Sequence, residues 1–205
     1  MQSFLPFKLD SIICGIDEAG RGCIAGSLFV CGVVLSQNIP LALKVQLKDS
    51  KSLSESKRNI LAPLIQQFSD FYLVKKTHQE IDDKGLSLCL KEALKEILQN
   101  LEASQYIFDG NCKFGVDLLQ TLIKGDSKLS CISAASIVAK NAKDKEMRDL
   151  DTLYPQYGFK KNKGYGSKAH LKAIKDYGYC AIHRKSFKLK SLMQNSNETL
   201  FGYNI

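Results

Sequence analysis

The chain has 205 residues, of which 44% are hydrophobic and 24% charged, enough apolar material for one large domain. Its first residues lack the basic start and long apolar run of a signal peptide, and the longest apolar stretch, residues 28–35, is too short to span a bilayer. We therefore expect a cytoplasmic protein that does not bind membranes. Seven scattered cysteines without Cys-x-x-Cys spacing, and only three histidines, argue against a disulfide framework or a zinc site.

The formal net charge of +8 is concentrated near the C-terminal end. Between residues 151 and 190, ten basic side chains stand against two acidic ones, and five tyrosines are interleaved with them. This composition is typical of a surface that attracts a phosphate backbone and its sugars, although a solvated basic face would look the same. The basic residues are Lys160, Lys161, Lys163, Lys168, Lys172, Lys175, Arg184, Lys185, Lys188 and Lys190.

The hydrophobic pattern predicts alternating strands and helices. Strands are expected at residues 12–17, 27–35, 71–74 and 106–108, with a weaker β segment at 116–123. Helices are expected from a capping box at 52–55 to about 68, then at 86–101, 132–150 and 168–177. This order indicates an α/β fold with a central mixed sheet flanked by helices and with a helical C-terminal part. We expect one catalytic domain at 1–190 and a polar tail at 191–205.

Two adjacent acids, Asp17 and Glu18, come at the end of the first predicted strand. Neighbouring carboxylates repel each other and are costly to desolvate, so a fold gains nothing by placing them there. A divalent cation would neutralise them. The alternative is an ordinary acidic turn after a strand.

Two further acids are candidates for the same site. Asp109 ends the predicted strand at 106–108, and Asp126 lies in a glycine turn. Strand ends at one edge of an α/β sheet bring distant groups together, so these four carboxylates are expected to converge. Oxygen ligands suit Mg²⁺ or Mn²⁺ better than zinc, and two such ions are a standard device for phosphodiester hydrolysis.

The adjacent acids pose a geometric problem. Consecutive strand residues point to opposite faces, so Asp17 and Glu18 cannot both face one metal site along a regular strand. Ala19, Gly20 and Gly22 are small residues that allow the backbone to turn sharply out of the strand. We therefore expect the strand to break at or just after Asp17. The glycines around Arg21 also allow a ligand to approach the backbone closely.

An ordered series of motifs resembles bacterial ribonuclease HII, of the type 2 ribonuclease H family, over about residues 12–188. The matching stretches are residues 15–22 (GIDEAGRG), 47–54 (LKDSKSLS), 108–111 (FDGN), 124–128 (KGDSK), 132–140 (ISAASIVAK), 164–170 (GYGSKAH) and 182–187 (IHRKSF).

The resemblance implies a ribonuclease H-like fold and a metal-dependent cut on the 5′ side of a ribonucleotide paired with DNA, leaving a 3′-hydroxyl and a 5′-phosphate. It carries the catalytic metal ligands over to Asp17, Glu18, Asp109 and Asp126. It implies that the backbone of Gly20, Arg21 and Gly22 reads the ribose 2′-hydroxyl, which distinguishes RNA from DNA. The family's sugar-stacking tyrosine maps to Tyr165.

Other positions have secondary roles or depart from the family. Lys51, Ser136 and Lys140 are weaker candidates for phosphate contacts, because a helix opening at 133–136 would present amides and hydroxyls. Asp144 is expected to support the site through a salt bridge, and His170 and His183 to be structural. Cys23 and Gly166 replace the family's usual prolines, and a glycine after Tyr165 is expected to loosen that loop.

We therefore expect a monomeric endoribonuclease that uses Mg²⁺ or Mn²⁺ and acts on RNA–DNA hybrids and on ribonucleotides embedded in duplex DNA. Two alternatives remain at this point. A nuclease of the same fold that cuts all-DNA substrates would also cluster carboxylates, and a catalytically silent module would only bind hybrids. The related ribonuclease HIII carries an extra N-terminal domain, which we do not expect here because only about eleven residues precede the first predicted strand.

Overall fold

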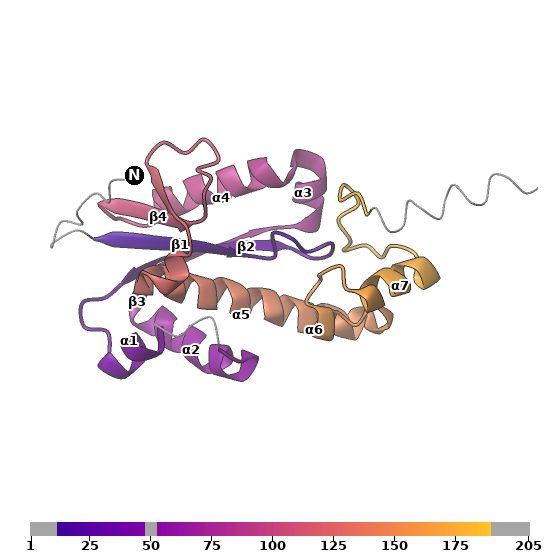
Figure 1. Ribbon diagram of the computed structural model, residues 1–205, viewed down its shortest axis with the longest axis horizontal. Helices are drawn as coiled ribbons and strands as arrows, with labels where there is room; N and C mark the ends of the chain where they lie inside the picture. The colour runs from indigo at the N-terminus through magenta and orange to yellow at the C-terminus, as the bar shows by residue number, and fades with distance from the viewer. Residues whose placement is uncertain (1–11, 48–52, 190–205) are drawn as a thin grey trace, which may run out of the picture.

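The computed structural model describes residues 12–47 and 53–189, and in these a five-stranded sheet lies between two layers of helices (Figure 1). The strand order is β3-β2-β1-β4-β5. The central strand, β1, pairs antiparallel with β2 and parallel with β4, so the expected mixed sheet is confirmed. The strands are β1 (Ile13–Ala19), β2 (Leu28–Leu35), β3 (Ser69–Lys76), β4 (Gln105–Asp109) and β5 (Leu119–Leu122).

Helices cover both faces of the sheet. On one face, α3 and α4 pack against the side chains of β1 that have even numbers, such as Cys14 and Ile16. On the other face, α1, α2 and the long α5 cover the odd-numbered positions, among them Ile13 and Ala19. The helices are α1 (Leu41–Leu47), α2 (Glu55–Gln67), α3 (His78–Lys84), α4 (Leu86–Asn100) and α5 (Ser130–Leu153).

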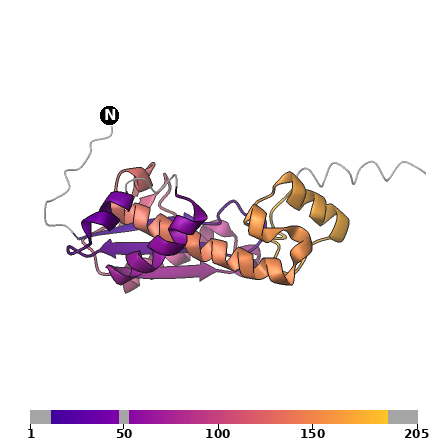
Figure 2. The ribbon, with the colours of Figure 1, turned by 90° about the horizontal axis from the view of Figure 1, so that it is seen from below.

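The C-terminal part forms a smaller lobe beyond one end of the sheet, beside the end of α5 (Figure 2). It contains α6 (Phe159–Asn162) and α7 (Lys168–Tyr177) and has its own apolar cluster around Phe159, Tyr157 and Ile174. Ile24 and Ala25, from the loop between β1 and β2, are buried in that cluster. The loop therefore connects the sheet to the lobe.

Gly15 lets α5 approach β1 closely. A Cβ atom at this position would lie 2.3 Å from the backbone nitrogen of Ile132 and 2.4 Å from the carbonyl carbon of Cys131. Any side chain would force the helix away from the strand. The contact fixes α5 against β1, and about one helical turn after Ile132 the helix places Ser136 beside Asp17.

Most expected elements are present with shifted ends. The helix expected at 168–177 matches α7, and the helix expected at 86–101 matches α4. The helix after residue 52 begins at Glu55 with Ser54 as its N-cap and continues through Pro63. Helix α1 was not expected, because its seven residues lack a strong apolar period. None of the helices within the described residues is both long enough and apolar enough to cross a membrane.

Substitution Gly15→Ala should lower the free energy of unfolding by about 3 kcal/mol or more, because the new methyl group meets backbone atoms that cannot rotate away. Urea unfolding would measure the change. Gly166→Ala is the matched control: its Cβ would lie 3.5 Å from the nearest atom, in ordinary contact, and should be neutral or stabilising by up to about 1 kcal/mol. Equal unfolding midpoints for the two variants would contradict the close approach of α5.

Candidate active site

Asp17 and Asp109 lie side by side at the ends of β1 and β4, on the face covered by α5. The parallel pairing of these strands ends at Ile16 and Phe108, so the next residue of each strand is an acid. The carboxylate of Asp109 accepts hydrogen bonds from the backbone nitrogens of Gly125 (3.0 Å) and Asp126 (3.3 Å). These bonds hold the short helix Gly125–Ser127, and with it Asp126, against the end of β4.

The expected break in β1 is wrong. The strand continues through Ala19, with Glu18 opposite Val30 and Ala19 opposite Phe29 of β2. Glu18 therefore starts from the α4 face, opposite to Asp17. The two carboxyl groups nevertheless come within hydrogen-bonding reach of each other, and Glu18 also interacts electrostatically with Asp109.

The approach of these two acids is explained by the neighbouring strand. Since β4 stops pairing at Phe108, β1 has no hydrogen-bonded neighbour on that side at Asp17 and Glu18. The side chain of Glu18 can reach around this open edge towards the acids on the other face. The geometric problem is thus solved by where β4 ends, and β1 stays regular.

Burial makes this acidic group unfavourable on its own. Desolvation and the nearby Glu18 raise the pKa of Asp17 to about 8, and burial likewise raises the pKa of Glu18. Oε2 of Glu18 is buried and has no hydrogen-bond partner among the described residues. A buried acceptor of this kind is costly unless a cation or a donor satisfies it.

The donor set fits a hard divalent cation. Carboxylate oxygens on adjacent strand ends are the ligands that Mg²⁺ and Mn²⁺ prefer, and they are neutralised by such an ion. Within residues 12–47 and 53–189, however, no three His, Cys, Asp or Glu side chains are already gathered as a closed metal site. Asp17 and Glu18 lie within hydrogen-bonding reach of each other, both interact electrostatically with Asp109, and Asp126 is attached to Asp109 through its backbone.

The loop after β1, residues 20–27, turns back beside Glu18. Gly20 has a φ of +93°, a conformation that favours glycine, and its carbonyl accepts a hydrogen bond from the backbone nitrogen of Cys23. The Arg21 side chain is 47% exposed, lies 3.6 Å from Glu18 and packs over the ring of Phe114. Its guanidinium group therefore lies at the border between the acids and solvent.

Gly22 and Tyr165 face each other across the opening of this loop. A Cβ atom at Gly22 would lie 3.8 Å from the Tyr165 ring, which is only ordinary contact, and Tyr165 is 51% exposed. Cys23, at the position of the family's proline, is fully buried and its thiol donates to the carbonyl of Lys163 (3.3 Å). Burial raises the pKa of the Cys23 thiol, which keeps it neutral. This thiol ties the loop to the segment that carries Tyr165.

The weaker phosphate candidates have different surroundings. The hydroxyl of Ser136 hydrogen-bonds to the carboxylate of Asp17, and Lys140 is exposed one turn further along α5. The expectation that 133–136 open a helix is wrong, because α5 begins at Ser130 and Ser133 donates to the carbonyl of Leu47. Lys51 lies outside the described residues.

The structure also places the residues that were expected to have supporting or structural roles. Asp144 is buried and forms a salt bridge with Arg58 (2.7 Å). His170 and His183 are both buried, with their Nε2 atoms 3.0 Å apart.

The sequence interpretation missed a group of buried charges beneath the loop at 20–27. Lys143 of α5 donates to the carbonyl of Ala25 (3.2 Å), and Glu146 accepts from the backbone nitrogen of Ser27 (2.9 Å). Arg184, which was counted with the basic surface, is only 1% exposed. The only sequence signal was the presence of Lys143 and Glu146 three residues apart, on the face of α5 that also carries apolar residues.

Comparison with known proteins gives a family. The ribonuclease HII family model matches residues 14–190. The chain belongs to the ribonuclease HII family. It is 48% identical over 185 residues to the ribonuclease HII of Aliarcobacter butzleri (strain RM4018), which covers 89% of this chain and 94% of that protein. The ribonuclease HII family consists of ribonuclease H endonucleases, so this chain is an enzyme of that class.

Solved structures show the same ribonuclease H-like fold. A chain in the PCNA:RNase HII complex from Archaeoglobus fulgidus is 27% identical, with a TM-score of 0.76, over 87% of this chain and 96% of that one. Bst-RNase HIII, solved in complex with Mn²⁺, is 20% identical with a TM-score of 0.68, over 86% of this chain and 67% of that one. The expected ribonuclease H-like fold is therefore confirmed for this chain.

Substitution Asp17→Asn should stabilise the metal-free protein at pH 8. An acid whose pKa is higher in the folded than in the unfolded state stabilises the fold below its unfolded pKa of about 4, and this contribution is lost as the pH rises to about 8. Thermal unfolding with chelator should show a decline in Tm between pH 5 and pH 8 that is larger for the wild type than for the variant.

Added Mg²⁺ or Mn²⁺ should raise the Tm of the wild type at pH 8 more than that of Asp17→Asn, because the ion binds the folded carboxylates. The matched control is Asp176→Asn, an exposed acid paired with Lys172 on α7, which should retain the metal response. Identical metal responses in wild type and Asp17→Asn would contradict the assignment of Asp17.

Proposed function

We propose that this enzyme hydrolyses the RNA strand of RNA–DNA hybrids and cuts on the 5′ side of ribonucleotides embedded in duplex DNA, leaving a 3′-hydroxyl and a 5′-phosphate. The observation that carries the proposal is the grouping of Asp17, Glu18 and Asp109 at one edge of the sheet, with Glu18 paired to Arg21 of the glycine loop. The chemistry and the recognition of ribose would then share one site.

The enzyme depends on divalent cations, and we propose Asp17, Glu18, Asp109 and Asp126 as the residues that hold them. The unsatisfied Oε2 of Glu18 and the raised pKa of Asp17 support this assignment, since a cation relieves both. When bound, two Mg²⁺ or Mn²⁺ ions would activate water and stabilise the leaving 3′ oxygen. Bst-RNase HIII, which shares the fold, binds Mn²⁺.

The other side chains would orient the acids and the substrate. The Gly125 and Asp126 amides hold the carboxylate of Asp109 in place, and the hydroxyl of Ser136 orients that of Asp17. Such fixed geometry favours catalysis because the reacting groups need not be reorganised.

Substrate recognition is proposed for the loop and Tyr165. Backbone groups of Gly20, Arg21 and Gly22 would contact the 2′-hydroxyl, and the exposed ring of Tyr165 would stack on the sugar beside the junction. A side chain at Gly22 would fit against Tyr165 without a clash, so packing within the protein does not explain the glycine. Close approach of a substrate to the backbone would explain it. Lys140 and Lys51 remain candidates for phosphate contacts.

Exposed lysines of the C-terminal lobe would grip the substrate backbone. Residues of α6 and α7 such as Lys160, Lys161 and Lys168 are exposed on the lobe that lies next to the glycine loop. We propose that residues 1–190 form the catalytic domain, with 191–205 as a tail, because the family match ends at residue 190. We propose that the enzyme acts as a monomer and is located in the cytoplasm.

The function is tested by incubating the enzyme with a DNA duplex that contains one ribonucleotide. Cleavage is expected with Mg²⁺ or Mn²⁺ and none with chelator, and the products should carry a 3′-hydroxyl and a 5′-phosphate. The control duplex has deoxyribose at the same position. If it is cut at an equal rate, the enzyme is a general nuclease and the recognition of the 2′-hydroxyl is refuted.

Substitution Asp109→Asn should reduce turnover to background while leaving hybrid binding within about 3-fold of the wild type, because the backbone contacts of the substrate lie elsewhere. Turnover is measured by gel cleavage and binding by fluorescence anisotropy. Asp117→Asn, an exposed acid before β5, is the control and should keep full activity. Full turnover in Asp109→Asn would overturn the metal assignment, and unchanged hybrid binding without turnover in the wild type would favour a silent binding module.

A further inference from the structure

The dipeptide His183-Arg184 is polar and yet fully buried, with exposed fractions of 0% and 1%. It belongs to the last motif of the chain, and the proposed function gives it no role. It lies in the loop that follows α7. The Arg184 side chain hydrogen-bonds to the backbone of the glycine loop, and the His183 side chain reaches the carbonyl of Tyr165 through His170.

Arg184 holds the glycine loop. Its Nε donates to the carbonyl of Gly26 (2.9 Å) and its Nη1 to the carbonyl of Arg21 (3.2 Å). Its backbone nitrogen donates to the carbonyl of Ile24 (2.9 Å). Three carbonyl groups of this loop are therefore turned inwards, towards one residue. A guanidinium group is suited to this task because its donors form a rigid planar fork.

His183 holds the segment of Tyr165 through a chain of hydrogen bonds. The backbone nitrogen of Cys180 donates to Nδ1 of His183 (2.9 Å), so the proton of His183 is on Nε2. That proton is donated to Nε2 of His170 (3.0 Å), which must then carry its own proton on Nδ1. Nδ1 of His170 donates in turn to the carbonyl of Tyr165 (2.8 Å).

This chain requires two neutral imidazoles, and the surroundings provide for them. Burial lowers the pKa of His183 to about 4 and also lowers that of His170. The rings of Tyr157 and Phe159 pack against both imidazoles. Each ring nitrogen is then either a donor or an acceptor, and the hydrogen bonds run in one direction, from His183 through His170 to Tyr165.

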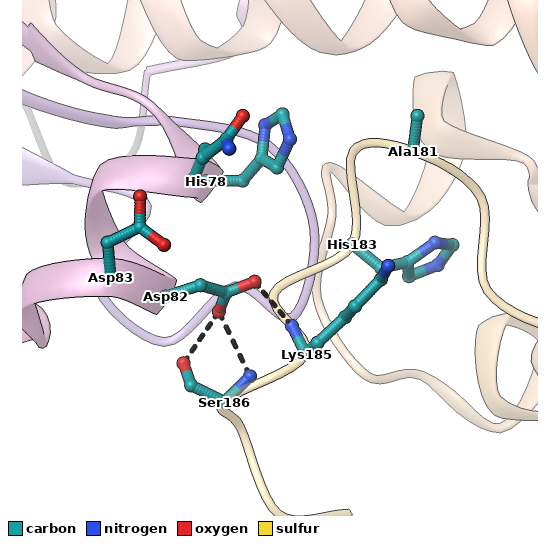
Figure 3. Close-up of a pocket in the computed structure, with 8 residues that line it drawn as sticks. His78, Asp82, Asp83, Ala181, His183, Lys185 and Ser186 are labelled. Atoms are coloured by element: carbon teal, nitrogen blue, oxygen red, sulfur yellow. Dashed lines mark hydrogen bonds between the residues drawn. The ribbon is translucent and has the colours of Figure 1, made fainter.

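The dipeptide is itself anchored to the main domain. Asp82 of α3 accepts hydrogen bonds from the backbone nitrogens of Lys185 (2.8 Å) and Ser186 (3.0 Å), as Figure 3 shows. A pocket of about 480 Å³ lies beside this anchor, lined by His78 and Asp83 of α3 and by Ala181 and His183 of the loop. The loop at 181–186 is thus fixed to the sheet domain as well as to the lobe.

We propose that His183 and Arg184 are a positioning pair that fixes the separation between the glycine loop at 20–22 and Tyr165, so that both engage the same ribonucleotide junction. Arg184 sets the position of one recognition segment, and the adjacent His183 sets that of the other. The inference rests on the proposed function, because it assigns a positioning role at the same site.

The consequence concerns substrates that offer different numbers of ribose groups. A single ribonucleotide in DNA presents one 2′-hydroxyl, so the loop and Tyr165 must be in register at that one step. A continuous hybrid presents a 2′-hydroxyl at every step, so it tolerates an error in the separation between the glycine loop and Tyr165. Loss of the positioning pair should therefore affect the single-ribonucleotide substrate more than the hybrid.

The test uses Arg184→Lys, which keeps the positive charge but cannot form both hydrogen bonds of the planar fork. We expect kcat on the single-ribonucleotide duplex to fall on the order of 10²-fold, the cost typical of a misplaced contact, with KM within about 3-fold of the wild type. On a continuous RNA–DNA hybrid the loss should be at least about 5-fold smaller. Rates are corrected for the folded fraction measured by thermal unfolding.

Arg58→Lys is the matched control. Arg58 is also poorly exposed and also donates to a backbone carbonyl, that of Leu53 (2.6 Å), but it contacts neither recognition segment. It should lower activity on both substrates by the same factor. If Arg184→Lys likewise reduces both substrates equally, its role is only structural and the proposal is overturned. Failure of the wild type to distinguish ribose from deoxyribose would instead refute the proposed function.

The histidine chain provides an independent test if Arg184→Lys does not fold. His183→Gln retains a side-chain N–H that can donate to His170, whereas His183→Leu has a similar size and no donor. We expect His183→Leu to lose more activity on the single-ribonucleotide duplex than on the continuous hybrid, and His183→Gln to keep most of its activity on both. If the ratio of the two activities is the same in both variants, at equal folded fractions, the role of His183 is overturned.

Discussion

The structure depends on how the fold holds two acids that repel each other. Asp17 is buried and Glu18 is half-buried; they are adjacent on one regular strand, and the pleat directs them to opposite faces. Their desolvation opposes folding in the absence of a cation, and the fold tolerates it because the sheet and α5 supply a large apolar core around them. Stability is given up at one end of β1 so that the charges are already in place for an ion.

A glycine and two buried basic side chains then determine the surroundings of these acids. The absence of a side chain at Gly15 brings α5 against β1, and the helix places Ser136 on Asp17 and Lys143 beneath the glycine loop. The loop is held from its inner side by Lys143 and Arg184, which bind its carbonyl groups. Its outer side is left open beside Tyr165. A rigid inner side and an open outer side are what a recognition loop needs.

The sequence was sufficient for the fold class and for the elements with strong periodicity, such as α4, α5 and α7. It was also sufficient for the four acids as candidates, since acids at strand ends are conspicuous. The sequence led to a wrong prediction at the end of β1. The alternation of side chains can be read along one strand, whereas the point at which β4 ends depends on how the whole sheet is assembled. The buried roles of Lys143 and Arg184 were hidden for a similar reason: a charged residue reads as surface until tertiary contacts are known.

The early end of β4 has a consequence for how this architecture can vary. Two more residue pairs between β1 and β4 would place backbone beside Glu18 and confine its side chain to the α4 face. Insertions on the far side of Gln105 would leave that edge open, whereas a lengthening after Asp109 would close it. Because β4 ends early, the edge of β1 beside it is open. Acidic side chains from both faces of the sheet can therefore join one cluster of charge at that edge.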